Sequence, residues 1–199
     1  KIALIEAKNM NLADNNKKIN KSNINYLDDR YIALSLNSKL LLNNINIWDK
    51  LNNKSTPIQN IEVSDQGGLG KTYLSSKNED LPALGYNLII QNLGEALLDN
   101  IKNLNNISIF ENTKLTNINN INPNLSSINI NNNKQIFGKL IIATDGANSY
   151  TRKLLNLRAK TKSFNQHAVI TTIALKRPHT DTAYERFTPD GPIGLIPCI

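Results

Sequence analysis

Two acidic residues stand at the ends of apolar runs that are typical of buried strands. Glu6 follows residues 2–5, and Asp145 follows the run that ends at Ala143. In dinucleotide-binding folds, a carboxylate at the end of a parallel strand accepts hydrogen bonds from ribose hydroxyls. Glu6 fits that role, but an acid after an apolar strand is a weak signal, and on its position alone a solvated residue at a strand end is the simpler explanation.

Asp145 and Gly146 also admit two explanations. Gly146 allows a positive φ or a close approach of a ligand. At the carboxyl edge of a parallel sheet, Asp145 would accept a hydrogen bond from a ligand. It would equally serve as a cap for the helix that follows. The spacing alone leaves both explanations open.

The elements that would position these residues follow from the apolar periodicity. After a strand at 2–6 we expect a polar loop to about residue 28. An amphipathic helix is then predicted near 35–51, and Trp48 is best explained as a core anchor. The apolar residues at helical spacing are Leu36, Leu40, Leu41, Ile45 and Trp48. A second amphipathic helix is predicted near 91–103.

The remaining segments predict strands. Residues 57–65 and 71–76 flank a glycine-rich turn and predict a hairpin. Four short strands are expected between 107 and 139, followed by a strand at 139–143. The segment 166–199 is predicted to be rich in strands, one of them at 168–175 directly after His167. Strands that alternate with helices indicate a parallel α/β sheet, whereas the hairpins indicate an antiparallel meander attached to it.

Composition narrows the functional classes. The 199 residues carry 23 Lys and Arg against 16 Asp and Glu, a net charge of +7. Lys, Asn and Ile are encoded by A/T-rich codons and are in excess together, so the charge is better explained by genome composition than by nucleic-acid binding. The basic residues form no cluster interleaved with aromatic residues.

Cysteine and hydropathy exclude further classes. The single cysteine, Cys198, excludes an internal disulfide and a multi-cysteine zinc site, and we expect no metal. It is best explained as a small core residue. No apolar run reaches the length of a membrane-spanning helix, so we expect a soluble or peripheral protein. The chain begins and ends inside strands without an initial Met, which leads us to expect a fragment of a longer chain.

Several short stretches of the sequence resemble those of a known protein family. They are "LIEA" at 4–7, "DDRYIALS" at 28–35, "TPIQNIEVSDQGGLG" at 56–70, "LPALGY" at 81–86, "LIIATDGANSYTR" at 140–152 and "AYERFTPDGPIGLIP" at 183–197. They resemble the class A flavoprotein monooxygenases. The stretches at 56–70, 81–86 and 183–197 are more specific. They resemble the ubiquinone-biosynthesis hydroxylases, above all the 2-polyprenyl-6-methoxyphenol hydroxylases.

The resemblance implies a set of cofactor-binding residues. Glu6 matches the acid that holds the adenosine ribose of FAD, and Arg30 matches an arginine near the FAD pyrophosphate. Gln91 stands where the family places a polar or basic residue against the flavin, although "NLIIQN" departs from the commoner "VVEN" or "VVEH". Asp145 and Gly146 match a motif associated with FAD and the pyridine nucleotide. Arg152 completes that motif and is expected to brace it.

The resemblance also implies an architecture. We expect an FAD-binding, Rossmann-like domain of the glutathione-reductase type at 1–57 and 85–155, and a substrate-binding β-sheet domain at 58–84 and 156–199, both incomplete. The family's Gly-x-Gly-x-x-Gly turn would precede Lys1 and its Gly-Asp motif would follow Ile199. We therefore expect these residues alone to bind FAD poorly.

The activity implied is hydroxylation of a polyprenylated phenol ring by FAD, NAD(P)H and O2 in ubiquinone biosynthesis. A cytoplasmic bacterial protein, peripheral at the inner membrane and associated with other enzymes of that synthesis, is consistent with it. No catalytic residue is identified, because His167 and His179 are more simply explained as structural or solvated. Two alternatives stay open: a related FAD-dependent reductase or epoxidase, and a non-catalytic remnant or structural partner of a biosynthetic complex.

Overall fold

The computed structural model describes residues 1–10, 30–122, 124–131 and 134–199. The polar loop expected up to residue 28 lies for the most part outside the described residues. The chain divides into two compact units, each made of two segments. Unit 1 comprises Lys1–Asn11 and Asn105–Thr172, and unit 2 comprises Leu12–Leu104 and Ile173–Ile199.

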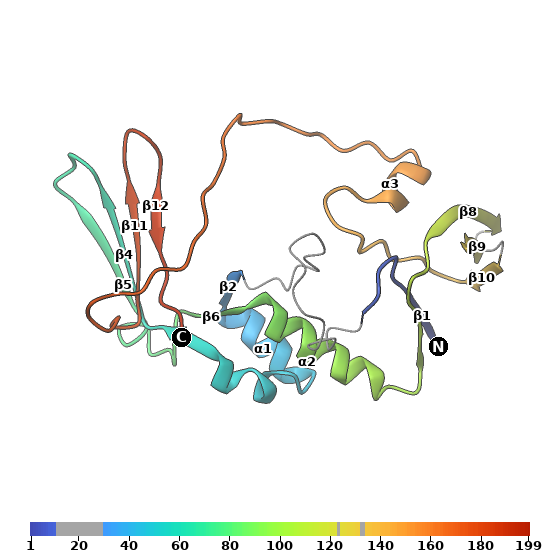
Figure 1. The fold of residues 1–199 in the computed structure, drawn as a ribbon, viewed down its shortest axis with the longest axis horizontal. Helices are drawn as coiled ribbons and strands as arrows, with labels where there is room; N and C mark the ends of the chain where they lie inside the picture. The colour runs from blue at the N-terminus through green and yellow to red at the C-terminus, as the bar shows by residue number, and fades with distance from the viewer. Residues whose placement is uncertain (11–29, 123, 132–133) are drawn as a thin grey trace, which may run out of the picture. The chain divides into compact units, whose positions relative to one another are not determined.

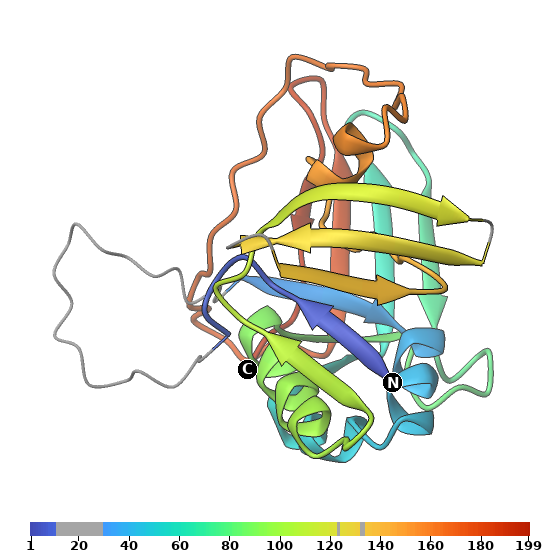
Figure 2. The ribbon, with the colours of Figure 1, turned by 90° about the vertical axis from the view of Figure 1, so that its right-hand side faces the viewer.

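Unit 1 contains a parallel pair of strands and an antiparallel sheet. The parallel pair is β1 (Ile2–Ile5) and β7 (Ile107–Phe110), whose arrows run in the same direction in Figure 2. The antiparallel sheet has the order β10-β9-β8 and consists of β8 (Leu115–Asn122), β9 (Leu125–Ile130) and β10 (Lys134–Gly138). A short helix, α3 (Tyr150–Leu154), follows. Because β1 and β7 are parallel, their carboxyl ends share one edge.

Unit 2 is built around a three-stranded antiparallel sheet with the order β2-β6-β3. Its strands are β2 (Tyr31–Ser35), β3 (Ser55–Ile58) and β6 (Gly85–Ile89). The central strand β6 is buried along most of its length, whereas β3 is an edge strand and so tolerates Pro57, which cannot donate a ladder hydrogen bond.

Helical segments supply the rest of the unit 2 core. They are α1 (Leu36–Asn44), the 3-10 turns η1 (Trp48–Lys50) and η2 (Asn52–Lys54), and α2 (Ile90–Lys102), with both α-helices marked in Figure 1. The buried cluster consists of Ile47, Trp48, Leu51, Ala83, Tyr86, Leu88 and Ala96. The rings of Trp48 and Tyr86 meet edge to face with centroids 4.9 Å apart, which confirms Trp48 as a core anchor.

A second sheet of unit 2 has the order β12-β11-β4-β5. Its strands are β4 (Asn60–Asp65), β5 (Lys71–Ser75), β11 (Thr182–Phe187) and β12 (Ile193–Leu195), and Figure 1 shows them side by side. The hairpin of β4 and β5 is confirmed, and Gly67 takes φ +88° in its turn. β11 joins β4 in parallel, so this sheet is mixed.

The helix predicted over 35–51 is too long. α1 ends at Asn44, and Asn46 takes the left-handed φ of 55°, which a continuing α-helix cannot contain. Leu41 is 67% exposed, whereas Ile47 and Leu51 beyond the helix are fully buried. By contrast, the helix predicted over 91–103 is confirmed as α2, where Leu93, Ala96 and Leu97 face the core.

Two predicted strands do not form. Residues 139–143 and the apolar stretch at 168–175 have no regular structure, although the four strands expected between 107 and 139 are present. A strand needs a hydrogen-bonded neighbour, and no described strand pairs with either segment. Their side chains are consequently exposed, with Ile142 at 74% and Val169 at 93%. No helix in the described part of the chain has the length and apolar character to cross a bilayer.

Candidate functional site

Asp145 caps the short helix α3. One carboxylate oxygen accepts a hydrogen bond from the Ser149 hydroxyl, and the other accepts one from the Thr151 backbone N–H at 2.9 Å. Ser149 is itself the N-cap, since its Oγ accepts from the Arg152 backbone N–H at 3.0 Å. The capping role that the sequence left open is therefore present in the structure.

These bonds favour the charged form of Asp145. The Ser149 hydroxyl, followed by the Thr151 backbone N–H, holds the pKa of Asp145 well below its ordinary value of 3.8. The carboxylate is exposed, so it is accessible as well as charged. It is a fixed anion at the start of a helix.

Gly146 and Arg152 shape the loop that carries this anion. Gly146 has φ +81°, as expected, and a Cβ there would meet no atom within 4 Å, so glycine is required by conformation and not by crowding. The Arg152 guanidinium donates from Nη2 to the Ala147 carbonyl at 2.7 Å. Arg152 thus braces the loop, as predicted.

Glu6 lies at the carboxyl end of the parallel pair β1–β7. Its backbone N–H donates to Phe110 O at 3.0 Å, which continues the ladder by one residue. Its Oε1 accepts from the Lys8 backbone N–H at 2.8 Å, so the loop after the strand holds the carboxylate in place. A carboxylate has about four lone-pair sites, which leaves acceptor capacity for a ligand.

Unit 2 brings Arg30 and Gln91 close together. The Ile90 backbone N–H donates to the Arg30 carbonyl at 2.9 Å, so the residue before β2 and the first turn of α2 are neighbours. The Gln91 amide donates to Glu95 Oε1 at 2.7 Å, a pair one helical turn apart. Glu6, Asp145 and Gly146 belong to unit 1, so the expected site residues fall into one group in each unit.

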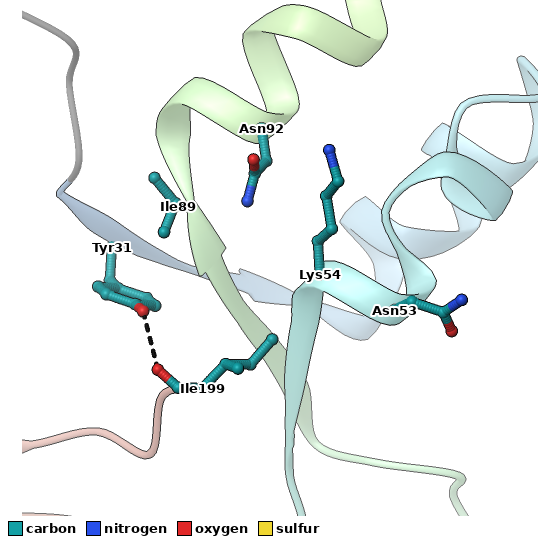
Figure 3. Close-up of a pocket in the computed structure, with 6 residues that line it drawn as sticks. All are labelled: Tyr31, Asn53, Lys54, Ile89, Asn92 and Ile199. Carbon is teal, nitrogen blue, oxygen red and sulfur yellow. Dashed lines mark hydrogen bonds between the residues drawn. The ribbon is translucent and has the colours of Figure 1, made fainter.

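A cavity of about 370 Å³ lies in unit 2 (Figure 3), and the residues that follow Arg30 and Gln91 in the chain are part of its lining. Its lining residues are Tyr31, Asn53, Lys54, Ile89, Asn92 and Ile199. The Tyr31 hydroxyl donates to the Ile199 carbonyl at 3.2 Å. Sequence reasoning missed these residues, because they come from separate segments and form no motif. Only Tyr31 and Asn92 stood next to residues that the sequence singled out, Arg30 and Gln91.

The two histidines show no catalytic arrangement. His179 is exposed; its Nε2 donates to the Cys198 carbonyl at 3.0 Å, and its Nδ1 lies 3.2 Å from Asp181 Oδ1. These contacts tie together two parts of the chain near the end of unit 2. His167 is exposed in the segment that lacks the strand expected after it.

Comparison with known proteins gives the family context. The ubiquinone biosynthesis monooxygenase COQ6 of Dictyostelium discoideum is 28% identical over 227 residues, covering 99% of this chain and 44% of the relative. The ubiquinone hydroxylase UbiL of Rhodospirillum rubrum is 26% identical over 170 residues, covering 85% of this chain and 39% of the relative. The chain thus spans less than half the length of these two relatives. No family model matches the chain.

A solved structure identifies the fold. PqsL of Pseudomonas aeruginosa, described as a probable FAD-dependent monooxygenase, superposes with a TM-score of 0.61 at 13% identity, over 81% of this chain and 40% of its own. At that identity the similarity concerns the fold alone. The chain is thus similar in sequence to ubiquinone-biosynthesis monooxygenases, and it shares the fold of the FAD-dependent monooxygenases.

Proposed function

We propose that the protein takes part in the FAD-dependent hydroxylation of a polyprenylated phenol ring in ubiquinone biosynthesis, with NAD(P)H and O2 as co-substrates. The observation that carries the proposal is the alignment of 99% of the chain with a ubiquinone biosynthesis monooxygenase. The placement of Glu6 at the carboxyl end of a parallel strand supports it, because ligands of open α/β sheets bind at that edge.

The described residues fit the parts of an FAD site that we assign to them. Glu6 offers a held carboxylate with free lone pairs for ribose hydroxyls, and Arg30 offers a permanent cation for the pyrophosphate. Gly146 has a positive φ, and no atom lies within 4 Å of the place where a Cβ would stand, so a ligand has room beside the Asp145 carboxylate. Gln91 can turn its amide toward the flavin by exchanging its bond to Glu95.

Bound FAD, once reduced by NAD(P)H, would supply the activation of O2 and the transfer of an oxygen atom to the ring. The protein must bind the cofactor, orient the phenol and exclude water. We propose that 1–57 and 85–155 form the cofactor-binding domain. Residues 58–84 and 156–199 then form the domain that binds the substrate.

One row of side chains on the β12-β11-β4-β5 sheet would suit an aromatic substrate. The register places Leu195, Tyr184, Glu62 and Tyr73 in one row across the four strands, and side chains in a row point to the same face. Tyr184 is 44% exposed and Tyr73 57%. Glu62 in this row is paired with Lys71 at 2.6 Å, and the other three residues of the row are a leucine and two tyrosines.

The test begins with the protein from the longest reading frame that contains this chain. We expect the purified protein to show flavin absorbance, to be stabilised by added FAD, and to oxidise NAD(P)H faster when a short-chain prenylphenol is present. A folded, colourless protein that FAD does not stabilise would reject the proposal and favour a remnant or structural partner. Flavin without phenol-stimulated oxidation would favour a related reductase or epoxidase.

Asp145 gives the sharper test, since its capping role must be separated from a cofactor role. Asp145→Ala removes the carboxylate and the cap, whereas Ser149→Ala loosens the cap and keeps the carboxylate. We expect Asp145→Ala to slow flavin reduction by NAD(P)H at least tenfold, a change of about 1.4 kcal/mol in the barrier. Ser149→Ala should slow it much less. Equal rates in the two variants would assign Asp145 to helix capping alone.

A further inference from the structure

The segment 196–199, which follows β12, is held against the β2-β6-β3 sheet by side chains. It has no regular secondary structure. Three consecutive carbonyls of the segment nevertheless each accept a hydrogen bond from a different part of unit 2. The donors are Asn87 of β6 to Pro197 O at 2.8 Å, His179 to Cys198 O at 3.0 Å and Tyr31 of β2 to Ile199 O at 3.2 Å. These side chains satisfy backbone groups that a partner strand would otherwise satisfy.

Asn87 is an unusual residue for its place in the sheet. It is 2% exposed and lies in the central strand β6, whose first four residues are all buried. Its amide nitrogen donates to the Pro197 carbonyl, but its Oδ1 has no hydrogen-bond partner among the described residues. A buried polar atom without a partner lowers the stability of a fold. An amide at this position is therefore better explained by the bond to Pro197 than by a contribution to the core.

Tyr31 and His179 hold the rest of the segment. Figure 3 shows the hydroxyl of Tyr31 directed at the Ile199 carbonyl. Burial, followed by the neighbouring Cys198 thiol, raises the pKa of Tyr31, so its hydroxyl stays protonated and keeps donating at neutral pH. The Nδ1 of His179 lies 3.2 Å from Asp181 Oδ1, which helps to orient the ring toward Cys198. Three parts of the chain that are distant in sequence thus fix the position of 196–199.

The segment connects two surfaces to which the proposed function assigns roles. Leu195, the residue before it, belongs to the row of side chains that would suit an aromatic substrate. Ile199 lines the cavity, whose lining also includes the residues that follow Arg30 and Gln91 in the chain. The four residues from Leu195 to Ile199 span at most about 13 Å. A displacement of the segment must therefore move Leu195, Ile199 or both.

We infer that Asn87 and Tyr31 are positioning residues for the proposed hydroxylation. By fixing the carbonyls of 196–199, they hold Leu195 in the substrate row and Ile199 at the cavity wall. The inference rests on the proposed function for the reaction that is positioned. A loosened segment would orient the phenol less well and admit water. NAD(P)H, a proton and O2 would then yield NAD(P)+ and hydrogen peroxide, and the ring would not be hydroxylated.

Two substitutions release the segment, and a third is a matched control. Asn87→Ala and Tyr31→Phe each remove one of the bonds to 196–199. Asn100→Ala removes a bond of the same kind elsewhere in unit 2, from the Asn100 amide to the Ile45 carbonyl at 2.9 Å. If Asn87→Ala is not stably folded, Tyr31→Phe carries the test, because it removes a single hydroxyl and keeps the ring.

The first measurement needs no cofactor. Cys198 lies within the segment and is partly buried, so the rate at which a thiol reagent modifies it reports how firmly the segment is held. Mass spectrometry identifies the modified peptide. We expect Asn87→Ala and Tyr31→Phe to accelerate the modification about tenfold, as for the loss of one hydrogen bond, and Asn100→Ala to leave it unchanged. Equal rates in all three variants would overturn the inference.

The second measurement uses the protein from the longest reading frame, with a short-chain prenylphenol as substrate. It determines what share of the oxidised NAD(P)H appears as hydrogen peroxide. We expect this share to rise at least twofold in Asn87→Ala and Tyr31→Phe but not in Asn100→Ala. Faster modification of Cys198 with an unchanged share would make the contacts purely structural, so the inference would be wrong while the proposed function stands. If the parent protein shows neither flavin nor phenol-stimulated oxidation, the proposed function fails and the positioning role fails with it, whatever the rate at Cys198.

Discussion

Truncating Leu51 tests where the core of unit 2 lies. Leu51 is fully buried beyond the end of α1, whereas Leu41 on the helix itself is 67% exposed. Replacing Leu51 by Ala removes three carbon atoms, worth about 0.8 kcal/mol each and about 2.4 kcal/mol together. The cavity left behind raises the expected loss to about 3 kcal/mol. Leu41→Ala should change the free energy of unfolding by less than about 0.5 kcal/mol.

Urea unfolding followed by Trp48 fluorescence measures both variants. Trp48 is the single tryptophan of the chain and lies in the unit 2 core, so its emission reports on that unit. With a slope of about 1.5 kcal/mol per molar urea, Leu51→Ala should lower the midpoint by about 2 M. If Leu51→Ala is too unstable to measure, Ile47→Val should cost about 1 kcal/mol. A larger effect at Leu41 than at these positions would show that the core follows the predicted long helix instead.

The remaining predictions concern the Asp145 cap and a glycine in the sheet. The pKa of Asp145 is lower in the folded state than in the unfolded state. Its contribution to the stability of the folded state is therefore complete above the unfolded pKa of about 3.9, and it is lost as the pH falls through the folded pKa. Hydrogen exchange at 150–154 should therefore stay protected to lower pH in the parent than in Ser149→Ala; identical pH profiles would contradict this. Gly85→Ala should destabilise unit 2 strongly, because its Cβ would lie 2.6 Å from the Leu34 carbonyl oxygen. Gly194→Ala, which meets no atom within 4 Å, is the control, and equal thermal midpoints would refute the predicted clash.

The sequence predicts those elements whose pattern is local. α2 was predicted nearly to the residue, because its apolar residues recur at helical spacing, and Leu93, Ala96 and Leu97 face one core. The hairpin of β4 and β5 was predicted because glycine turns and flanking strands are adjacent in the chain. α1 was predicted too long, because Leu40, Leu41 and Ile45 continue the apolar spacing although the backbone turns at Asn46.

Strands that depend on distant partners were harder to predict. An apolar run such as 139–143 has strand propensity, but the ladder hydrogen bonds must come from another segment. None of the described strands supplies them. The same limit applies to the single strand predicted at 57–65. In the structure the chain leaves one sheet after Ile58 and enters another at Asn60, so this segment forms two strands. Apolar periodicity can be recognised within one segment of the sequence. Whether a strand belongs to a given sheet depends on its hydrogen-bonded partner strand, which the periodicity does not identify.

The candidate site shows the same division between local and distant information. The Asp145 cap, the positive φ of Gly146 and the Arg152 brace lie within eight residues of one another. The sequence offered the cap and the positive φ each as one of two explanations, and the family resemblance implied the brace. The cavity beside Arg30 draws its lining from β2, η2, β6, α2 and the last residues of the chain. No spacing rule joins these segments, so Lys54 carried no signal before the structure placed it beside α2.

Capping and cofactor contact need not exclude one another at Asp145. Its two oxygens accept one hydrogen bond each from α3, and a carboxylate has about four lone-pair sites, so about two remain. The bonds that hold the pKa low also keep the carboxylate charged and fixed, and the side chain is exposed. A group that orients a ligand must itself be held in place by neighbouring bonds. The cap therefore supplies the rigidity that a cofactor contact at Asp145 would require. For this reason the comparison with Ser149→Ala, and not Asp145→Ala alone, shows whether Asp145 has a cofactor role in addition to the cap.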